Sequence, residues 1–369
     1  MIVAINCRNL THHKMEGFGN YTYELVQRWI EWHPEVQFVL LFDREPKVRF
    51  TEYSHVKNVI IGPPTRHPLL YWCWFEWSLP RVLKREQATV FFSPDGYNSL
   101  RSIVPSIITV HDINFEHYPK DLPYLLSHYL RHFFPKFVRK AKHVLTVSQF
   151  SRQDIIQKYG CEPVKISHIY NGPNPQFLPI SQEQKVVVRE RICSGRPYFL
   201  FVGSLHPRKN VHRLVNAYLK LNPSDIDLVI VGSAMWDKQQ FNLNEAQKSH
   251  VHFLGYLEKS ELVNVMAAAL ALTYVPYFEG FGIPLVEAMR CGTPILCSNN
   301  TCLPEVAGNA AIYCDPFNED DIFMGMKRLL DDPNLLQNLS LKGLERASKF
   351  SWDNAAQEAW DKLVITANT

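Results

Sequence analysis

Residues 198–221 read YFLFVGSLHPRKNVHRLVNAYLKL, and this stretch decides the fold. Its first five residues, Tyr198–Val202, are apolar without alternation, which predicts a strand that is buried on both faces. Gly203 ends the strand, and the segment Val211–Leu221 has the apolar spacing of a helix. A strand, a glycine loop and a helix in this order are typical of an α/β domain with a doubly wound parallel sheet.

The same alternation of apolar strands and helical segments extends over the whole chain. Toward the C-terminus, strands are expected at Leu228–Val231, Val251–Leu254, Ala271–Tyr274, Pro294–Ser298 and Ala310–Tyr313, and helices at Lys259–Ala269, Pro284–Cys291 and Asp320–Leu330. Toward the N-terminus, strands are expected at Ile2–Asn6, Gln37–Phe42, Asn58–Ile61, Thr89–Ser93, Ile107–Val110, His143–Val147 and Lys165–Ile169, and helices at Gly19–Trp32, Leu69–Arg85, Leu122–Lys140 and Gln149–Tyr159.

A break between the two series of strands divides the chain. Residues 171–179 are dense in turn formers and are followed by the polar stretch Ser181–Arg191, and we interpret this region as a hinge. We therefore predict an N-terminal Rossmann-like domain at residues 1–175, completed by a tail helix within residues 352–369, and a C-terminal Rossmann-like domain at residues 176–351. Two such domains would face each other across a cleft at the carboxyl ends of their strands, where ligands generally bind.

The composition of the 369 residues narrows the function classes. A formal net charge of +3 gives no indication of a nucleic-acid partner, and the eight cysteines show neither a C-x-x-C pair nor zinc-finger spacing. The N-terminus lacks the basic start of a signal peptide, and the nearly apolar stretch 265–275 is too short to span a bilayer. We expect a cytoplasmic protein, and contact with a membrane surface stays open.

Two cations stand in the loop between the strand 198–202 and the helix after it. Arg208 and Lys209 precede Asn210, which is a suitable N-cap for that helix. Positive charge, hydrogen-bond donors and the helix dipole would all favour a diphosphate there. The alternative is a solvated basic loop, which we consider weaker because the charges follow the ligand-facing end of a strand.

A second loop carries two glutamates at a fixed spacing. Glu279 stands beside Gly280 and Gly282, and Glu287 follows near the start of the next helix. A carboxylate at that position can accept hydrogen bonds from the hydroxyls of a ribose, and Glu279 is placed to meet sugar hydroxyls. The alternative is that both glutamates are ordinary acids at a helix start.

The N-terminal half contributes two weaker signals. Gly17 and Gly19 lie in Glu16-Gly-Phe-Gly-Asn-Tyr21, where a phosphate-contacting loop and a plain tight turn are equally consistent with the sequence. His111 directly follows the strand Ile107–Val110 and is therefore expected at the ligand-binding edge of the first sheet.

Taken together, these residues resemble the GT-B-fold retaining glycosyltransferases of glycosyltransferase family 4, and among them bacterial mannosyltransferases. The resemblance covers almost the whole chain. Its most specific blocks are Glu279–Glu287 and Asn300-Thr-Cys-Leu-Pro-Glu305, supported by the residues Val110-His-Asp112, Thr146-Val-Ser148, Tyr170-Asn-Gly172, Gly203, Arg208-Lys209-Asn210 and Phe253-Leu-Gly-Tyr256.

The resemblance implies a role for each candidate residue. Arg208 and Lys209 would hold the donor diphosphate and stabilise the leaving group, while Glu279 and His111 would contact the donor sugar. The remaining donor-binding residues would be Glu287 at the ribose, Tyr256 and Leu257 around the base, the backbone of Gly280, Phe281 and Gly282 at the sugar, and the glycines Gly17, Gly19 and Gly203. Glu16 and Asp112 would lie on the acceptor side.

The resemblance further implies a reaction without a metal or another cofactor, because the cationic loop replaces the magnesium that other transferases use. It implies retention of the anomeric configuration, and we name no protein nucleophile. Glu16 stands where relatives often have a second glycine. A carboxylate near the donor phosphates would repel them, so we expect Glu16 to point toward the acceptor.

The predicted helix Leu69–Arg85 begins with the aromatic run Tyr71-Trp-Cys-Trp-Phe-Glu-Trp77. Core packing is our first interpretation of this run, and contact with a membrane surface through aromatic anchors is the second.

We therefore expect an enzyme that moves a hexose from a nucleotide-sugar donor to a glycan or lipid-linked acceptor in polysaccharide biosynthesis. GDP-mannose is the favoured donor, by resemblance alone, and a UDP-sugar is the alternative. A GT-B epimerase that acts on a nucleotide sugar without an acceptor, or a binding subunit without turnover, would use the same fold.

Overall fold

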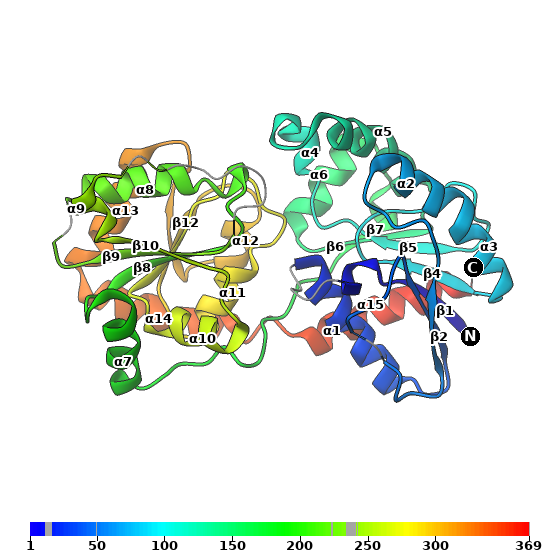
Figure 1. The fold of residues 1–369 in the computed structure, drawn as a ribbon, viewed down its shortest axis with the longest axis horizontal. Coiled ribbons are helices and arrows are strands. Elements are labelled where there is room, and N and C mark those ends of the chain that lie inside the picture. The colour runs from blue at the N-terminus through cyan, green and yellow to red at the C-terminus, as the bar shows by residue number, and fades with distance from the viewer. Residues whose placement is uncertain (12–16, 49, 223, 234–240, 242, 369) are drawn as a thin grey trace. The chain divides into compact units, whose positions relative to one another are not determined.

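The computed structural model describes residues 1–11, 17–48, 50–222, 224–233, 241 and 243–368. It contains two compact units, Met1–Asn171 together with Trp352–Thr369, and Gly172–Ser351 (Figure 1). Each unit is a parallel sheet with helices packed on it, as the alternation of strands and helices predicts. The cleft between the units and the hinge at residues 171–179 stay predictions.

The first unit contains a seven-stranded sheet in the order β3-β2-β1-β4-β5-β6-β7. Every pairing in it is parallel, and the chain reverses direction across the sheet between β1 and β4, as in doubly wound folds. The strands are β1 Ile2–Asn6, β2 Gln37–Phe42, β3 Val56–Ile60, β4 Val90–Ser93, β5 Ser106–Thr109, β6 His143–Thr146 and β7 Ile166–His168.

Helices cover both faces of this sheet because successive strand residues point to opposite sides. Phe91 in β4 packs in the cluster under Trp74 and Phe75, whereas Phe92 meets Trp29 on the other face, with ring centroids 5.0 Å apart. The main helices are α1 Gly17–Trp32, α2 Pro68–Cys73, α3 Leu79–Arg85, α4 Asn114–His117, α5 Tyr124–Lys140, α6 Gln149–Tyr159 and α15 Trp352–Ala367.

The aromatic segment 69–85 is mainly core, and it is not one continuous α-helix. A π-helical turn, Trp74–Ser78, separates α2 from α3. Trp74, Phe75 and Leu79 are fully buried, so the packing interpretation holds for them. Leu69 and Trp77 are exposed. None of the helices in the described part of the chain is long and apolar enough to cross a membrane.

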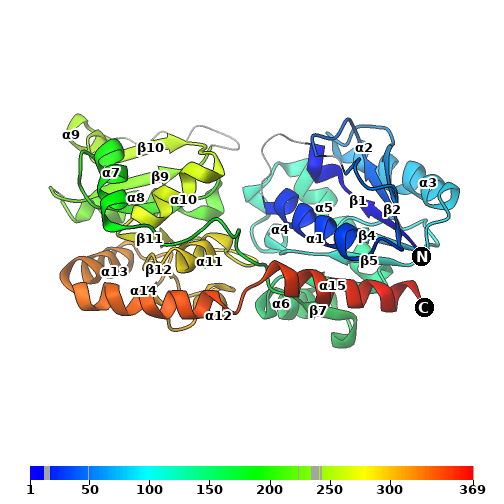
Figure 2. The same ribbon diagram turned by 90° about the horizontal axis from the view of Figure 1, so that it is seen from below.

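The C-terminal helix α15 belongs to the first unit, as expected for a tail that crosses back. Its backbone accepts a hydrogen bond at 2.8 Å from the indole of Trp29, through the carbonyl of Ala356. Trp360 stacks on His33 with ring centroids 3.9 Å apart. Figures 1 and 2 both show α15 running alongside α1.

The second unit contains a six-stranded parallel sheet in the order β10-β9-β8-β11-β12-β13. The strands are β8 Tyr198–Val202, β9 Asp227–Val231, β10 Val251–Gly255, β11 Ala271–Tyr274, β12 Ile295–Ser298 and β13 Ala311–Cys314. The helices are α7 Gln182–Cys193, α8 Val211–Lys220, α9 Glu245–Lys248, α10 Lys259–Ala268, α11 Ile283–Arg290, α12 Leu303–Ala307, α13 Glu319–Asp331 and α14 Pro333–Ala347.

The polar stretch Ser181–Arg191 forms helix α7, which the sequence analysis did not predict, so this stretch is not an irregular linker. The side chain of Ser181 accepts the amide of Gln184, whose own side chain accepts the amide of Ser181, and this capping box starts the helix. Only Val188 and Cys193 are buried along α7, so the segment lacks the apolar periodicity by which we predicted the other helices.

Candidate active site

The candidate site of the second unit lies at the carboxyl edge of its sheet. Gly203 directly follows β8, Tyr256 follows β10, and the loop of Glu279 follows β11. Because the strands of this sheet are parallel, their carboxyl ends share one edge. The donor-binding residues predicted in this unit are therefore brought to one side of the sheet or to the helices that begin there.

The two loop cations and the first glutamate form one ion-pair cluster. The ammonium of Lys209 donates to Glu279 Oε1 and, at 2.6 Å, to the hydroxyl of Tyr274. Arg208 Nη1 lies 3.4 Å from the same carboxylate oxygen and donates to the carbonyl of Phe278 at 3.2 Å. Two cations against one carboxylate leave a net charge of +1, which favours an anionic ligand.

The cluster fixes the protonation of its members. Burial alone would raise the pKa of Glu279, whose side chain is 8% exposed, but the charges of Lys209 and Arg208 hold that pKa below its ordinary value. Burial, reinforced by the Glu279 carboxylate, raises the pKa of Tyr274 far above its ordinary value. Tyr274 is therefore a neutral hydroxyl that donates to Glu279 at 3.0 Å. No local sequence pattern indicated this third partner.

The turn at Gly203 depends on a second glycine. Gly232, which follows β9, has a φ of +142°, and a Cβ on it would lie 1.8 Å from the carbonyl oxygen of Gly203. The amide of Gly203 donates to the carbonyl of Val231 at 3.0 Å. Only glycine permits this approach, so Gly232 positions the start of the cationic loop.

Asn210 does not have the capping role that we predicted. It adopts the left-handed conformation, with a φ of +59°, and its side chain makes no cap hydrogen bond. Its amide group instead donates to the carbonyls of Val275 and Pro316, at 2.9 and 2.7 Å. Asn210 therefore ties the cationic loop to the segments that follow β11 and β13, which a local sequence rule could not predict.

The glycine loop after β11 is held by Cys302 and by Leu303, the first residue of α12. Gly282 has a φ of +87°, and a Cβ there would lie 2.7 Å from a methyl group of Leu303. The thiol of Cys302 donates to the carbonyl of Glu279 at 3.3 Å. Phe281 is buried as well. The segment Gly280–Gly282, whose backbone we predicted to contact the donor sugar, is therefore a loop anchored by its neighbours.

Two further polar groups lie beside this loop that the sequence analysis did not single out as site residues. Asn300 donates through Nδ2 to the carbonyl of Tyr277 at 3.1 Å. Asn300 Oδ1 and Thr301 Oγ1 are buried without a hydrogen-bond partner among the described residues. Thr301 also has a φ of +55°, which is rare for a β-branched residue. Strain and unpaired polar groups of this kind concentrate at functional sites.

Glu287 lies in the middle of α11 and not near its start. Burial raises the pKa of this carboxyl to about 8, although the charge of Lys259 lowers it. Glu287 is therefore largely protonated at neutral pH in the absence of a ligand. The predicted base-contacting residues Tyr256 and Leu257 follow β10, and Tyr256 is 38% exposed.

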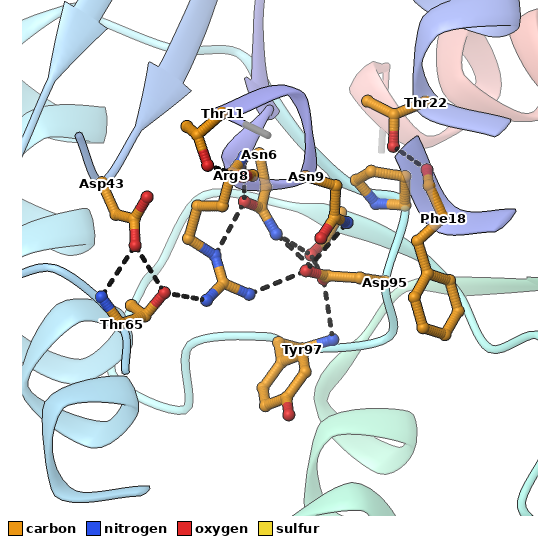
Figure 3. Close-up of polar contacts among 12 residues, drawn as sticks. Asn6, Arg8, Asn9, Thr11, Phe18, Thr22, Asp43, Thr65, Asp95 and Tyr97 are labelled. Carbon is orange, nitrogen blue, oxygen red and sulfur yellow. Dashed lines mark hydrogen bonds and ion pairs between the residues drawn. The ribbon is translucent and has the colours of Figure 1, made fainter. Parts of the chain in front are cut away.

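The first unit carries a polar network at the carboxyl edge of its own sheet, which the sequence analysis missed (Figure 3). Asn6 ends β1, Asp43 follows β2 and Asp95 follows β4. The guanidinium of Arg8 connects these residues. It donates to Asn6 at 3.0 Å, to Asp95 at 2.7 Å and to the hydroxyl of Thr65 at 2.8 Å, and that hydroxyl donates to Asp43 at 2.7 Å. These residues lie far apart in the sequence, so no local pattern indicates the network.

His111 lies at the same edge, as predicted. The Nε2 atom of His111 is 2.8 Å from the carbonyl oxygen of Pro94. The imidazole packs in T-shaped geometry against the rings of Phe18 and Tyr21, with ring centroids 4.7 Å apart in each pair. Burial lowers the pKa of His111, which keeps the imidazole neutral at pH 7. Asp112 accepts the amide of Asn114 at 3.0 Å, at the start of α4.

The two N-terminal glycines do not form the turn that we considered. Gly17 is the first residue of α1, and Gly19 lies in the first turn of that helix, where it is buried. The helix thus begins two residues earlier than the apolar periodicity suggested. Glu16, predicted on the acceptor side, lies outside the described residues.

Among the residues that the structure describes, one cluster has the residue types of a metal site, namely Cys193, Asp227 and His252. Asp227 begins β9, so the cluster is at the amino edge of the sheet, away from the candidate site. Arg196 contacts both oxygens of the Asp227 carboxylate, at 2.9 and 3.0 Å, and His250 and His252 contact one oxygen each. These partners account for the buried carboxylate without a metal ion.

Comparison with known proteins gives two family matches. The family model described as Glycosyltransferase Family 4 matches residues 15–177, and the model described as Glycosyl transferases group 1 matches residues 183–346.

Individual proteins resemble the chain over most of its length. It is 29% identical to the O-antigen chain mannosyltransferase B of Escherichia coli, over 93% of this chain and 94% of that protein. It is 29% identical to the O-antigen chain mannosyltransferase RfbU of Salmonella typhimurium, over 79% of this chain and 78% of that protein. A sucrose-phosphate synthase from Thermosynechococcus elongatus has a similar fold, with a TM-score of 0.78, 16% identity and full coverage (100%) of both chains.

Proposed function

The chain is a GT-B glycosyltransferase of the families Glycosyltransferase Family 4 and Glycosyl transferases group 1, and we propose that it transfers mannose from GDP-mannose to a growing polysaccharide chain. The choice of mannose is supported by the two O-antigen mannosyltransferases that the chain resembles. A UDP-sugar is the alternative donor.

The observation that carries the proposal is the cluster of Arg208, Lys209 and Glu279 at the carboxyl edge of the second sheet. Bond cleavage at the sugar leaves a nucleoside diphosphate that gains negative charge. Preformed cations at that position stabilise the transition state more than the ground state. In the absence of a donor, Glu279 occupies both cations, and a bound diphosphate would compete with it for them.

The remaining donor contacts follow from this placement. Glu279 and the backbone of Gly280 to Gly282 would hold the donor sugar. Glu287 would accept hydrogen bonds from the ribose hydroxyls. Tyr256 and Leu257, which lie in the loop between the end of β10 and the start of α10, would border the base. In the first unit, His111 would contact the sugar near the reacting carbon.

We further propose that the reaction needs no metal ion and retains the anomeric configuration. Arg208 and Lys209 supply the positive charge that a divalent ion would otherwise provide at the diphosphate. The departing phosphate can assist attack on the same face of the sugar, so no protein nucleophile is required.

A lipid-linked glycan is the acceptor that we propose. A peripheral contact with the membrane surface would bring the enzyme to such an acceptor. The exposed side chains of Leu69 and Trp77, next to the basic residues Arg81, Lys84 and Arg85, are the part of segment 69–85 that is available for it. Asp112 and Glu16 keep their proposed place on the acceptor side.

The first experiment measures melting temperature with GDP, UDP, ADP and their sugar conjugates, in EDTA and in magnesium. A nucleotide at about a hundred times its dissociation constant should add about 2.7 kcal/mol of stability. We expect GDP and GDP-mannose to give the shift equally in EDTA and in magnesium. A shift with UDP alone would replace the donor, and no shift with any nucleotide would refute the transferase assignment of this site.

Matched arginine variants locate the effect. Arg208→Met should lose the shift, because Arg208 faces Glu279. Arg213→Met should keep it, because Arg213 is not one of the two cations paired with Glu279 and lies over the ring of Phe317, 5.6 Å from its centroid. Transfer of labelled mannose to a lipid-linked glycan then separates a transferase from an epimerase or a binding subunit, neither of which would label the acceptor.

A further inference from the structure

The ion pair between Arg8 and Asp95 is the most enclosed charge pair of the network in Figure 3. Arg8 Nη2 and Asp95 Oδ2 are 2.7 Å apart, and the two side chains are only 5% and 4% exposed. The guanidinium also lies within 5.2 Å of the ring centroids of Tyr71, Trp74, Phe75 and Tyr97. An aromatic cage of this kind further removes the pair from water.

Stability alone does not explain such a pair. Taking two charges out of water costs several kcal/mol per ion, and packed apolar residues of similar volume often stabilise a fold equally well or better. Removing one partner, by contrast, leaves a buried unpaired charge. A buried pair that ties several loops together therefore suggests that the position of those loops matters.

The contacts of Asp95 show which loop is held. Asp95 Oδ1 accepts from Asn6 at 2.9 Å and from the hydroxyl of Ser93 at 3.0 Å, and Oδ2 accepts from Arg8. The carboxylate is thus fixed from β1, from the loop after β1 and from the end of β4. Pro94 stands between Ser93 and Asp95, so its carbonyl is held on both sides.

That carbonyl determines the state of His111. A carbonyl only accepts hydrogen bonds, so the Nε2 atom that faces Pro94 at 2.8 Å must carry the proton. The neutral imidazole then has its lone pair on Nδ1. The rings of Phe18 and Tyr21 limit rotation of the imidazole, and the hydroxyl of Ser151 donates to the backbone carbonyl of His111 at 3.1 Å.

We propose that Asp95, held by Arg8 and Asn6, is a positioning residue that keeps His111 in the tautomer with Nε2 protonated, through the carbonyl of Pro94. In this tautomer, Nδ1 accepts a hydrogen bond from a hydroxyl of the sugar substrate. The inference rests on the contact between His111 and the sugar in the proposed function.

The experiment combines nitrogen NMR of histidine-labelled protein with steady-state kinetics. The spectrum of His111→Gln lacks one signal pair and so assigns His111 in the wild type. We expect the wild type to show the Nε2-protonated tautomer and Asp95→Asn to show a mixture or the other tautomer. We expect kcat to fall by about 100-fold, as misplacement of a reacting group can cause, with the donor KM within about twofold.

Glu76→Gln is the matched control, because Glu76 is also a buried carboxylate of the first unit. It accepts the amides of Leu100 and Arg101, at 2.9 and 3.1 Å, and these residues do not contact His111. The control should lower stability and leave the His111 signals and kcat within about twofold of the wild type. If Asp95→Asn fails to fold because it leaves Arg8 unpaired, the double variant Arg8→Met with Asp95→Asn removes both charges and takes its place.

A wild-type tautomer in the Asp95 variants would overturn the inference, and so would a kcat equal to that of the wild type. A wild-type enzyme that transfers no sugar would count against the proposed function instead. The NMR measurement on the same samples would still decide whether Asp95 sets the tautomer.

Discussion

Glu287 is a carboxyl in α11 that carries a proton near neutral pH, because burial raises its pKa from 4.5 to about 8. The folded state therefore binds a proton that the unfolded chain has released between about pH 4.5 and 8. The stability that this carboxyl contributes is complete below pH 4.5 and is lost as the pH rises toward 8. Ribose hydroxyls that donate to this group would favour its charged form.

Nucleotide binding at pH 7 should therefore release up to about one proton from Glu287. Calorimetric titration in buffers of different ionisation enthalpy measures that release. Glu287→Gln is isosteric and cannot ionise, so its binding enthalpy should not depend on the buffer, and its melting temperature should fall less between pH 5 and 8. Equal buffer dependence in both proteins would remove Glu287 from the ribose site.

Thr301 is a second residue whose local state predicts a measurable effect. Its φ of +55° costs about 1–2 kcal/mol in a residue with a Cβ, and its hydroxyl is buried without a partner among the described residues. Thr301→Gly should raise the unfolding free energy by about 0.5–1 kcal/mol, since the loss of chain entropy offsets part of the gain.

Urea denaturation measures this change. Thr301→Ala removes the hydroxyl but keeps the strained backbone, and it should fall between the wild type and Thr301→Gly. If glycine lowers stability relative to alanine, the strain is not present in solution.

The ends of β8 and β9 approach each other closely through the glycines that follow them, Gly203 and Gly232. An alanine at Gly232 would place a Cβ 1.8 Å from the carbonyl of Gly203, so one strand end must shift. We expect Gly232→Ala to cost about 3 kcal/mol and to weaken nucleotide binding, because the cationic loop starts at Gly203.

Gly255 provides the control at the neighbouring strand end. It has a φ of +67° and no atom within 4 Å of an added Cβ, so Gly255→Ala should cost only about 1–2 kcal/mol of backbone strain. Chemical denaturation and nucleotide-dependent melting give both quantities. Similar losses in the two variants would mean that the close approach to Gly203 is not important.

The chain returns to its first unit through its C-terminal helix α15. Trp360 is 6% exposed and contacts Trp29, His33 and Phe38 of that unit. Trp360→Ala should lower the stability of the first unit by about 3–5 kcal/mol, and calorimetry should show a shift in one transition only. Ile365→Ala changes a residue of the same helix that is 59% exposed, and it should have little effect. Equal shifts of both transitions would mean that the two units unfold together.

Sequence patterns predicted those helices and strands whose buried residues form a recognisable apolar pattern along the chain. Tyr198–Val202 and Ala271–Tyr274 are strands with the predicted bounds, because they are short, mainly apolar runs and every residue in them is buried. The same reasoning failed for Gln182–Cys193, since an exposed helix has little apolar periodicity to detect. Capping chemistry at Ser181 and Gln184 was the signal that could have identified it.

The sequence alone determined the fold class, the order of strands and helices, and the residue types at the candidate site, since each follows from short-range spacing. Only the tertiary structure decided which of these residues meet. Lys209 pairs with Glu279 across 70 positions, and Arg8 pairs with Asp95 across 87. Such pairs form because parallel strands bring distant loops to one edge, and burial there then fixes the charge of each group. Neither the contact nor the resulting pKa is present in the local sequence, because both depend on what the fold places nearby.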